Sequence, residues 1–143
     1  MARNIIDLPT LGDDGRLYRD TALDLVESLI PNPWESCHAP DLLELENGDL
    51  LCCWFAGSSE GNADISIAVA RLPAGASQWE QPVIVSDDPT RSEQNPSLFQ
   101  NPNGDIWLMY TAQAAKKPDD NSDDSLQGTA EIRRKISRDG GRT

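Results

Sequence analysis

The chain is poor in basic residues, and this scarcity excludes several classes of function. Its 143 residues contain 12 Lys and Arg against 24 Asp and Glu, for a net charge of −12 at pH 7. Residues 1–130 carry 7 basic and 22 acidic groups (−15), whereas residues 131–143 carry 5 and 2 (+3). Nucleic-acid phosphates and anionic membrane surfaces are bound through clustered Lys and Arg, so we expect neither as a partner.

Long apolar runs and paired cysteines are also missing. No stretch approaches the roughly 18 apolar residues of a membrane helix, and Met1–Asp7 leads into polar sequence without the apolar region of a secretory signal. The three cysteines, Cys37, Cys52 and Cys53, lack zinc-site spacing, so we expect inert thiols, no metal and no other cofactor. These features predict a cytoplasmic protein, or an extracellular one if the N-terminus is incomplete.

The chain does contain an internal repeat of two hairpin patterns. His38–Phe55 and Asn95–Tyr110 each combine an early proline, an apolar run, an Asn-Gly-Asp turn and a second run rich in aromatic residues. Asn-Gly between apolar runs is a strong hairpin signal, since a type I′ turn needs positive φ at both central residues. The two turns begin at Asn47 and Asn103, which lie 56 residues apart, and this spacing predicts a repeat architecture.

Further strand-forming sequence follows each hairpin. Asp64–Ala70 and Pro82–Val85 predict a third and a fourth strand in the first repeat, and Thr129–Ser137 predicts a third strand in the second. Between the strands of the second repeat, Lys116–Gly128 predicts an exposed acidic loop. Its oxygen-bearing residues, counted from Asp119, do not fit the spacing of an EF-hand.

The last seven residues, Ser137–Thr143, fit an Asp-box (S-x-D-x-G-x-T-W) up to its final position. In this turn Asp and Ser side chains bond backbone amides, and glycines supply positive φ. Arg71–Trp79 fits a degenerate copy with one residue inserted before its Trp. We expect that Trp and two others, Trp54 and Trp107, to pack in the core, the last two at matching strand positions.

The segments Cys37-His38-Ala39-Pro40 and Trp54-Phe55-Ala56-Gly57, with the Asn-Gly-Asp turns and the Asp-box, resemble the sialidase superfamily over about residues 38–143. The resemblance implies an all-β fold, a partial β-propeller with about two blades from a parent of six or seven. Residues 1–30 would form an N-terminal segment with a propeller-closing strand, and residues 31–143 the first blade and an incomplete second. Arg16–Ile30 also fits an amphipathic helix, but we favour a strand. We expect the chain to be the N-terminal part of a longer protein.

The resemblance places candidate catalytic residues in the first blade. Sialidases clamp a substrate carboxylate with arginines, but His38 stands where the first Arg would be, and Ala56–Glu60 offers no second. His38 is either a proton carrier, because histidine as a residue type exchanges protons near neutral pH, or a residue that caps the strand. Glu60 and Asp64 follow the second strand, where sialidases carry an acid/base Asp. Each can instead be a turn or loop residue.

Arg91, Gln94 and Asn95 form the equivalent strand start in the second repeat, and we assign them to substrate binding. Arg91 could contact a substrate carboxylate, and the two amides could bond sugar hydroxyls. The alternatives are a surface arginine and a turn shaped by Asn95 before proline. The predicted partner is a carbohydrate substrate, and unpaired blade faces would allow self-association.

These residues predict a carbohydrate-active enzyme, either a glycoside hydrolase acting on exo-linked sugars or a lyase that cleaves at a uronate. The alternative is a non-catalytic propeller that binds glycan or protein. In sialidases the nucleophile and the third arginine come from later blades. By itself the chain would therefore be inactive.

Overall fold

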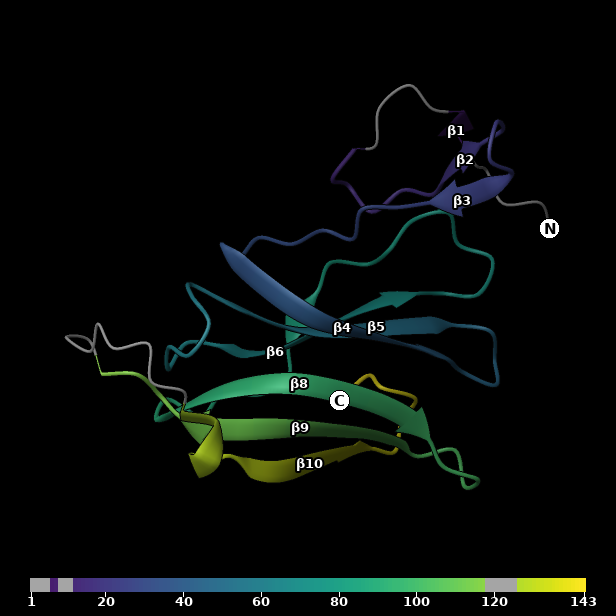
Figure 1. Cartoon of the computed structure of the whole chain (residues 1–143). Coiled ribbons are helices and arrows are strands. Elements are labelled where there is room, and N and C mark those ends of the chain that lie inside the picture. The colour runs from purple at the N-terminus through teal and green to yellow at the C-terminus, as the bar shows by residue number, and fades with distance from the viewer. Residues whose placement is uncertain (1–5, 8–11, 118–125) are drawn as a thin grey trace.

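The computed structural model describes residues 6–7, 12–117 and 126–143, which form three β-sheets and one 3₁₀ helix (Figure 1). The N-terminal sheet contains three strands, and two larger sheets follow, which we call the first and the second blade. The elements are β1 (Ile6–Asp7), β2 (Tyr18–Asp20) and β3 (Leu25–Glu27) in the N-terminal sheet; β4 (Ser36–Glu44), β5 (Leu50–Gly57), β6 (Ser66–Leu72) and β7 (Val83–Ile84) in the first blade; β8 (Arg91–Gln100), β9 (Ile106–Ala114) and β10 (Glu131–Ser137) in the second blade; and η1 (Leu126–Thr129) before β10.

Each blade is an antiparallel meander in which strands adjacent in sequence are also hydrogen-bonded neighbours. The strand order is β4-β5-β6-β7 in the first blade and β8-β9-β10 in the second. Figure 1 shows the two blades as stacked layers, and β8 packs against β4, β5 and β6. The all-β prediction is confirmed, as are the third and fourth strands expected in the first repeat and the third in the second.

Both Asn-Gly-Asp hairpins form, but the predicted type I′ turn is wrong. Of the two central residues in the first turn, only Gly48 has positive φ (84°). The Gly48 amide donates to the carbonyl of Leu45 at 2.8 Å, and the Leu45 amide donates to the carbonyl of Asp49 at 2.8 Å. This is a type I turn closed by a left-handed glycine, the usual three-residue hairpin loop. The turn at Gly104 (φ 87°) repeats the same two bonds.

The inner strands β4 and β8 each carry a β-bulge next to a proline. Register shifts between His38 and Asp41 in β4 and between Gln94 and Ser97 in β8. The residue before each proline, Ala39 or Asn95, has positive φ (51° and 50°). The residue before each proline is thus left-handed at a position where a proline disfavours the right-handed helical region, and it lies in the bulge. The bulges make His38 and Gln94 equivalent in the two blades.

Two apolar clusters fill the spaces beside the first blade. One lies between the blades and contains Leu45, Leu51, Cys53, Phe55, Ile65 and Ile67 from the first and Leu98, Ile106, Leu108 and Tyr110 from the second. The other lies between the first blade and the N-terminal segment and contains Leu17, Cys52, Trp54, Ala56, Ala68, Ala70, Leu72 and Trp79. Among the described residues the first blade is therefore covered on both faces, and the second on one.

The predicted match between Trp54 and Trp107 is wrong. Counted from the Asp of its hairpin turn, Trp54 is the fifth residue and Trp107 the second. Because this spacing reverses the alternation of faces, Trp54 lies in the N-terminal cluster, with Trp34 edge-on at 6.4 Å between ring centroids. Trp107 is half-buried on the open face of the second blade, 5.3 Å from the Phe99 ring, and the Arg134 guanidinium lies 4.2 Å above it.

The N-terminal segment forms strands, as favoured, and no helix in residues 16–30. It is attached to the first blade beyond β6, because the Leu17 amide donates to the carbonyl of Ser77 and the Trp79 amide to the carbonyl of Gly15, both at 2.9 Å. Whether it closes a propeller stays a prediction. Most of the predicted acidic loop lies outside the described residues. Within them, no helix is both long and apolar enough to span a membrane.

The blades are joined at their outer end by a buried arginine. Arg71, at the end of β6, forms an ion pair with Asp49 in the first hairpin turn and donates to the carbonyl of Gly140 in the Asp-box. The Asp49 carboxylate also accepts the Ala74 amide at 2.8 Å, and this bond is the main reason that its pKa is lowered. The Arg71 side chain thus connects one turn of each blade, and Asp49 links this pair to the turn at Ala74.

The first seven positions of the Asp-box form the hydrogen-bonded turn that the motif predicts. Asp139 accepts hydrogen bonds from the amides of Arg142 and Thr143, both at 3.0 Å, and from the Thr143 hydroxyl at 2.6 Å. The Ser137 hydroxyl donates to Asp139 at 2.6 Å and accepts the Gly141 amide at 2.8 Å. These bonds stabilise the ionised carboxylate, and the bond from Ser137 has the largest effect. They hold the pKa of Asp139 well below its usual range.

Candidate functional site

The six residues predicted for the site lie at one end of the two blades. His38 is near the start of β4, and Glu60 and Asp64 are in the loop from β5 to β6. The group Arg91, Gln94 and Asn95 belongs to the first half of β8. The Glu93 amide donates to the carbonyl of Ile65 at 2.9 Å, so the starts of β6 and β8 are direct neighbours. Strand topology therefore brings the six residues to a common edge, but their side chains differ in exposure and in hydrogen-bond partners.

His38 has an exposed side chain held against an aromatic ring. It pairs in register with Phe55 of β5, and the two ring centroids are 5.6 Å apart at an interplanar angle of 55°. The bulge at Ala39 follows directly and fixes the backbone. This arrangement orients the imidazole on one side and leaves the other to solvent, as proton exchange with a bound molecule requires.

The loop that carries Glu60 and Asp64 is organised by the second of these residues. Asp64 accepts the Ser58 amide at 3.0 Å and the Ser58 hydroxyl at 2.9 Å. Asn62 adds a bond to the Ser58 hydroxyl at 3.0 Å, and the carbonyl of Gly61 accepts the Lys116 amide at 2.8 Å. Asp64 thus closes the loop, whereas Glu60 is exposed at its tip. A catalytic role for either carboxylate stays a prediction.

Arg91 is engaged by the second blade. Its guanidinium donates to the carbonyl of Ala112 at 2.9 Å and of Thr129 at 3.1 Å, and it pairs with Glu131 at 2.8 Å. These contacts tie β8 to the far side of its own sheet. A substrate carboxylate would have to compete with Glu131 for this arginine.

Gln94 and Asn95 differ although they are adjacent. Gln94 is 3% exposed and donates to the Ser92 hydroxyl at 2.9 Å. Asn95 is exposed at the bulge and donates to the Thr111 hydroxyl at 3.3 Å. Of the two amides, only that of Asn95 is accessible for a sugar hydroxyl.

A groove of about 310 Å³ adjoins the candidate site and contains only His38 of the six residues. Its other lining residues are Ile30, Asn32, Cys37, Pro40, Cys52 and Trp54. The Trp54 indole donates to the Asn32 side chain at 3.2 Å, which orients one polar group at an otherwise apolar wall. Burial raises the pKa of the Cys52 thiol to about 11 and that of Cys53 to about 12, so these two thiols lie in the core, as predicted. Cys37, which was expected to be a core thiol as well, is exposed.

A buried charged network beside Arg91 was not predicted from the sequence. Glu93 is 1% exposed, and its carboxylate lies 3.9 Å from Arg133, which also pairs with Asp88 at 2.7 Å. Burial, together with the Glu93 charge, raises the pKa of the neighbouring Tyr110 hydroxyl. The equivalent strand position in the first repeat is Cys37, so the repeat pattern contains no signal for a buried carboxylate here. The described residues contain no group of three His, Cys, Asp or Glu side chains suited to a metal ion.

Comparison with known proteins agrees with the fold. The model of the BNR repeat-like domain family matches residues 48–143. A Hadza microbial sialidase, Hz136, superposes with a TM-score of 0.60 at 18% identity, over 77% of this chain and 25% of that one. A protein of unknown function from Dyadobacter fermentans gives 0.57 at 19% identity, over 75% and 34%. No curated protein matches.

This chain therefore spans about a quarter of the length of the first structure and about a third of the second. At these identities the likeness concerns the fold alone. Since the family model covers more than half of the chain, including the second hairpin and the Asp-box, the chain belongs to the BNR repeat-like domain family and has a sialidase-like, partial β-propeller fold.

Proposed function

We propose that this chain supplies the first two blades of a carbohydrate-active β-propeller enzyme in which His38 carries a proton to or from the bound sugar. The observation that supports this proposal is the exposed His38 imidazole, held against Phe55 at the rim of the 310 Å³ groove. It lies on a strand beside a bulge; bulges are frequent next to active sites, where they re-aim side chains, and sites on strands are more precise than sites on loops. The sialidase-like fold supports the substrate class.

The chemistry can run in two ways. In hydrolysis, the imidazolium gives its proton to the leaving glycosidic oxygen while water adds at the anomeric carbon. In elimination, the neutral imidazole removes the proton next to a uronate carboxylate, and the resulting electron pair forms a double bond and expels the glycosidic oxygen. The absence of arginine at the His38 and Ala56–Glu60 positions makes cleavage of sialic acid the least favoured hydrolysis.

The test is turnover by the full gene product on uronate-containing and neutral glycans. His38→Gln places the residue of the second blade at the equivalent backbone position, so folding should be preserved. We expect kcat to fall about 100-fold or more, while Arg19→Gln, at an exposed position of the N-terminal sheet, serves as the control. Unsaturated uronate absorbing in the ultraviolet would identify elimination. Unchanged turnover in a folded His38→Gln protein would remove the assignment.

A non-catalytic glycan-binding propeller is the second candidate, and one observation favours it. Asp64 and Arg91 are engaged by partners within the protein, and Gln94 is buried. A site whose charged groups already have partners is better suited to hydrogen-bonding neutral hydroxyls than to proton transfer. Saturable glycan binding without product release from any glycan would select this function.

A further inference from the structure

The two Asn-Gly-Asp turns share their backbone bonds but hold their asparagine side chains differently. In the first turn, the Asn47 side-chain carbonyl accepts the Asp49 amide at 3.0 Å. In the second turn, the corresponding Asp105 amide donates to the Asn101 side chain at 2.9 Å, which leaves Asn103 without this bond. The Asn103 side chain is exposed and has no hydrogen-bond partner among the described residues.

The first turn is also anchored more firmly to the rest of the protein. Its Asp49 is buried, pairs with Arg71 and accepts the Ala74 amide at 2.8 Å. The side-chain bonds of the second turn come, within the described part of the chain, from residues 100–105 themselves. Strand register places Ile136 where the first blade has Arg71, since each pairs with the second residue after its turn. The second turn is therefore expected to open more readily.

An asparagine side chain followed by glycine can react with the backbone between them. The Gly104 amide nitrogen gives its proton to water and attacks the side-chain carbonyl carbon of Asn103. The side-chain nitrogen leaves as ammonia, and water opens the resulting cyclic imide to aspartate or isoaspartate. Glycine favours the attack because it has no Cβ beside the nitrogen. Since the Gly104 amide is bonded to the carbonyl of Asn101 at 2.9 Å, the turn must open first.

We propose that Asn103 is a site of spontaneous deamidation in the folded protein, and that Asn47 is protected although the same two residues follow it. Both reactions require the glycine amide to leave its backbone bond, at 2.8 Å in the first turn and 2.9 Å in the second. Asn47 must in addition give up its bond to the Asp49 amide, and its turn must move against the Arg71 ion pair. One such additional hydrogen bond slows the reaction about fivefold.

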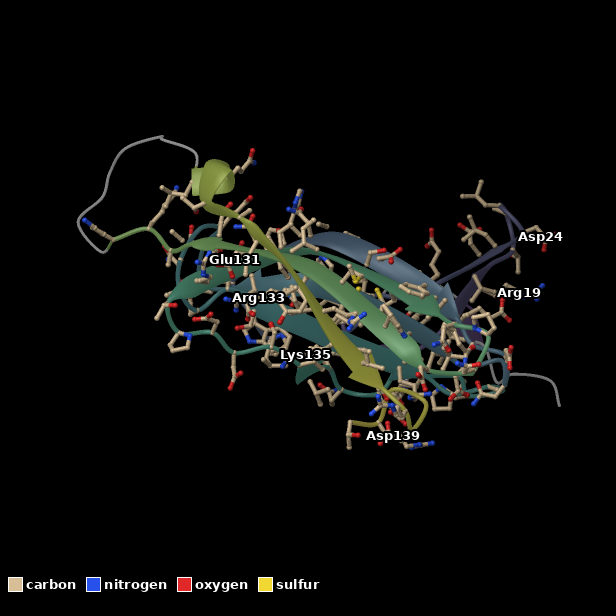
Figure 2. All side chains as sticks on the ribbon, turned by 90° about the horizontal axis from the view of Figure 1, so that it is seen from below. Arg19, Asp24, Glu131, Arg133, Lys135 and Asp139 are labelled. Atoms are coloured by element: carbon tan, nitrogen blue, oxygen red, sulfur yellow. The ribbon has the colours of Figure 1, made fainter. Side chains whose placement is uncertain are left out.

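The modification lies away from the candidate site. β10 begins at Glu131, which pairs with Arg91 at the site, and it ends beside the turn, where Ser137 pairs in register with Ile106. Figure 2 shows Glu131 and Asp139 at opposite ends of β10. The aspartate product adds a negative charge to the turn, and the isoaspartate product lengthens its backbone by a methylene group. Deamidation therefore weakens the β8–β9 hairpin and leaves the proposed proton carrier in place.

The test is incubation of the full gene product in mildly alkaline buffer, with both asparagines followed in one peptide map by mass spectrometry. We expect Asn103 to deamidate faster than Asn47 by about fivefold or more. In guanidinium chloride, where neither turn is folded, the two rates should be similar, because glycine follows both asparagines. Hydrogen exchange gives a second measurement on the unmodified protein, in which the Gly104 amide should exchange faster than the Gly48 amide.

A matched pair of variants tests the consequence for stability. The longer side chain of Asn103→Gln places its carbonyl badly for attack by the Gly104 nitrogen, so this variant should keep its urea midpoint during incubation. Asn47→Gln makes the same change in the first turn, and its midpoint should fall with time as that of the wild type does. Equal falls in the two variants would contradict the effect on the hairpin.

Three results would overturn the proposal. The first is equal deamidation of Asn47 and Asn103 in the folded protein. The second is a ratio of the two rates that is the same in the folded and the unfolded protein, because the difference would then come from the neighbouring sequence alone. The third is an intact Asn103 in the folded protein after the unfolded protein has reacted completely, which would mean that the second turn is protected as well.

Discussion

The two blades share a backbone plan and differ in what surrounds it. Each has an inner strand bulged before a proline and a hairpin closed by a left-handed glycine. The first blade is covered on both faces, by the N-terminal segment and by the second blade. Within the described residues the second blade is open on one face, where Phe99 is 42% and Ile132 78% exposed. In this part of the chain the two blades therefore differ in cover, although their backbone plan is the same.

The same comparison separates structural from functional positions. His38 and Gln94 occupy equivalent places before the two bulges, yet His38 is exposed at a groove and Gln94 is buried. The backbone is thus repeated, while the chemistry at the shared position is not. A residue that differs at a repeated position is a better candidate for function than one that is the same in both blades.

The largest effect is expected from breaking the connection between the blades. Arg71→Ala leaves Asp49 buried without its ion-pair partner and removes the bond to the carbonyl of Gly140. We expect a loss of about 3 kcal/mol in the free energy of unfolding, measured with urea. Arg19→Ala, which removes an exposed pair with Asp24 at 3.7 Å, should cost less than about 0.5 kcal/mol. Similar losses in both variants would show that Arg71 does not join the blades.

Acid should weaken the second blade through its carboxylates. Hydrogen bonds from Thr90 and the neighbouring Arg133 lower the pKa of Asp88, and the Asp-box bonds lower the pKa of Asp139. Both carboxylates therefore bind a proton less readily in the folded state than in the unfolded state. Their contribution is complete above the unfolded pKa near 4 and is lost as pH falls through the folded values. Tm should be nearly flat above about pH 5 and fall below about pH 4. Asp139→Asn should reduce this fall, and an unchanged slope would contradict the account.

Much of the fold was predictable because its signals are local. Alternating apolar residues and turn dipeptides located the strands of both blades, and the Asp-box spacing located the last turn. Turn type was not predictable, because the choice between a two-residue and a three-residue loop depends on strand register. The Arg71 connection also escaped prediction, since its partners lie 22 and 69 residues away in the chain.

The candidate site was predictable only as a set of positions. Strand topology determines that Asp64, Arg91 and His38 reach one edge, and the sequence contains that information. The sequence does not show which partner each side chain binds in the folded protein: Asp64 accepts hydrogen bonds from Ser58, and Arg91 pairs with Glu131. These pairings depend on three-dimensional neighbours and decide which groups are accessible to a ligand.

The smallest effect is expected at the bulge in β8. The question there is whether the left-handed backbone conformation of Asn95 or its side-chain bond determines the stability of the bulge. Asn95 has positive φ and an exposed side chain, and asparagine tolerates this conformation better than alanine. Asn95→Ala should cost about 1 kcal/mol of unfolding free energy in urea, and Asn95→Gly less than about half of that, because glycine has no Cβ to clash. Both variants lose the bond to Thr111, so the difference between them isolates the backbone. Equal losses would mean that the Thr111 bond, and not the left-handed conformation, determines the stability of this bulge.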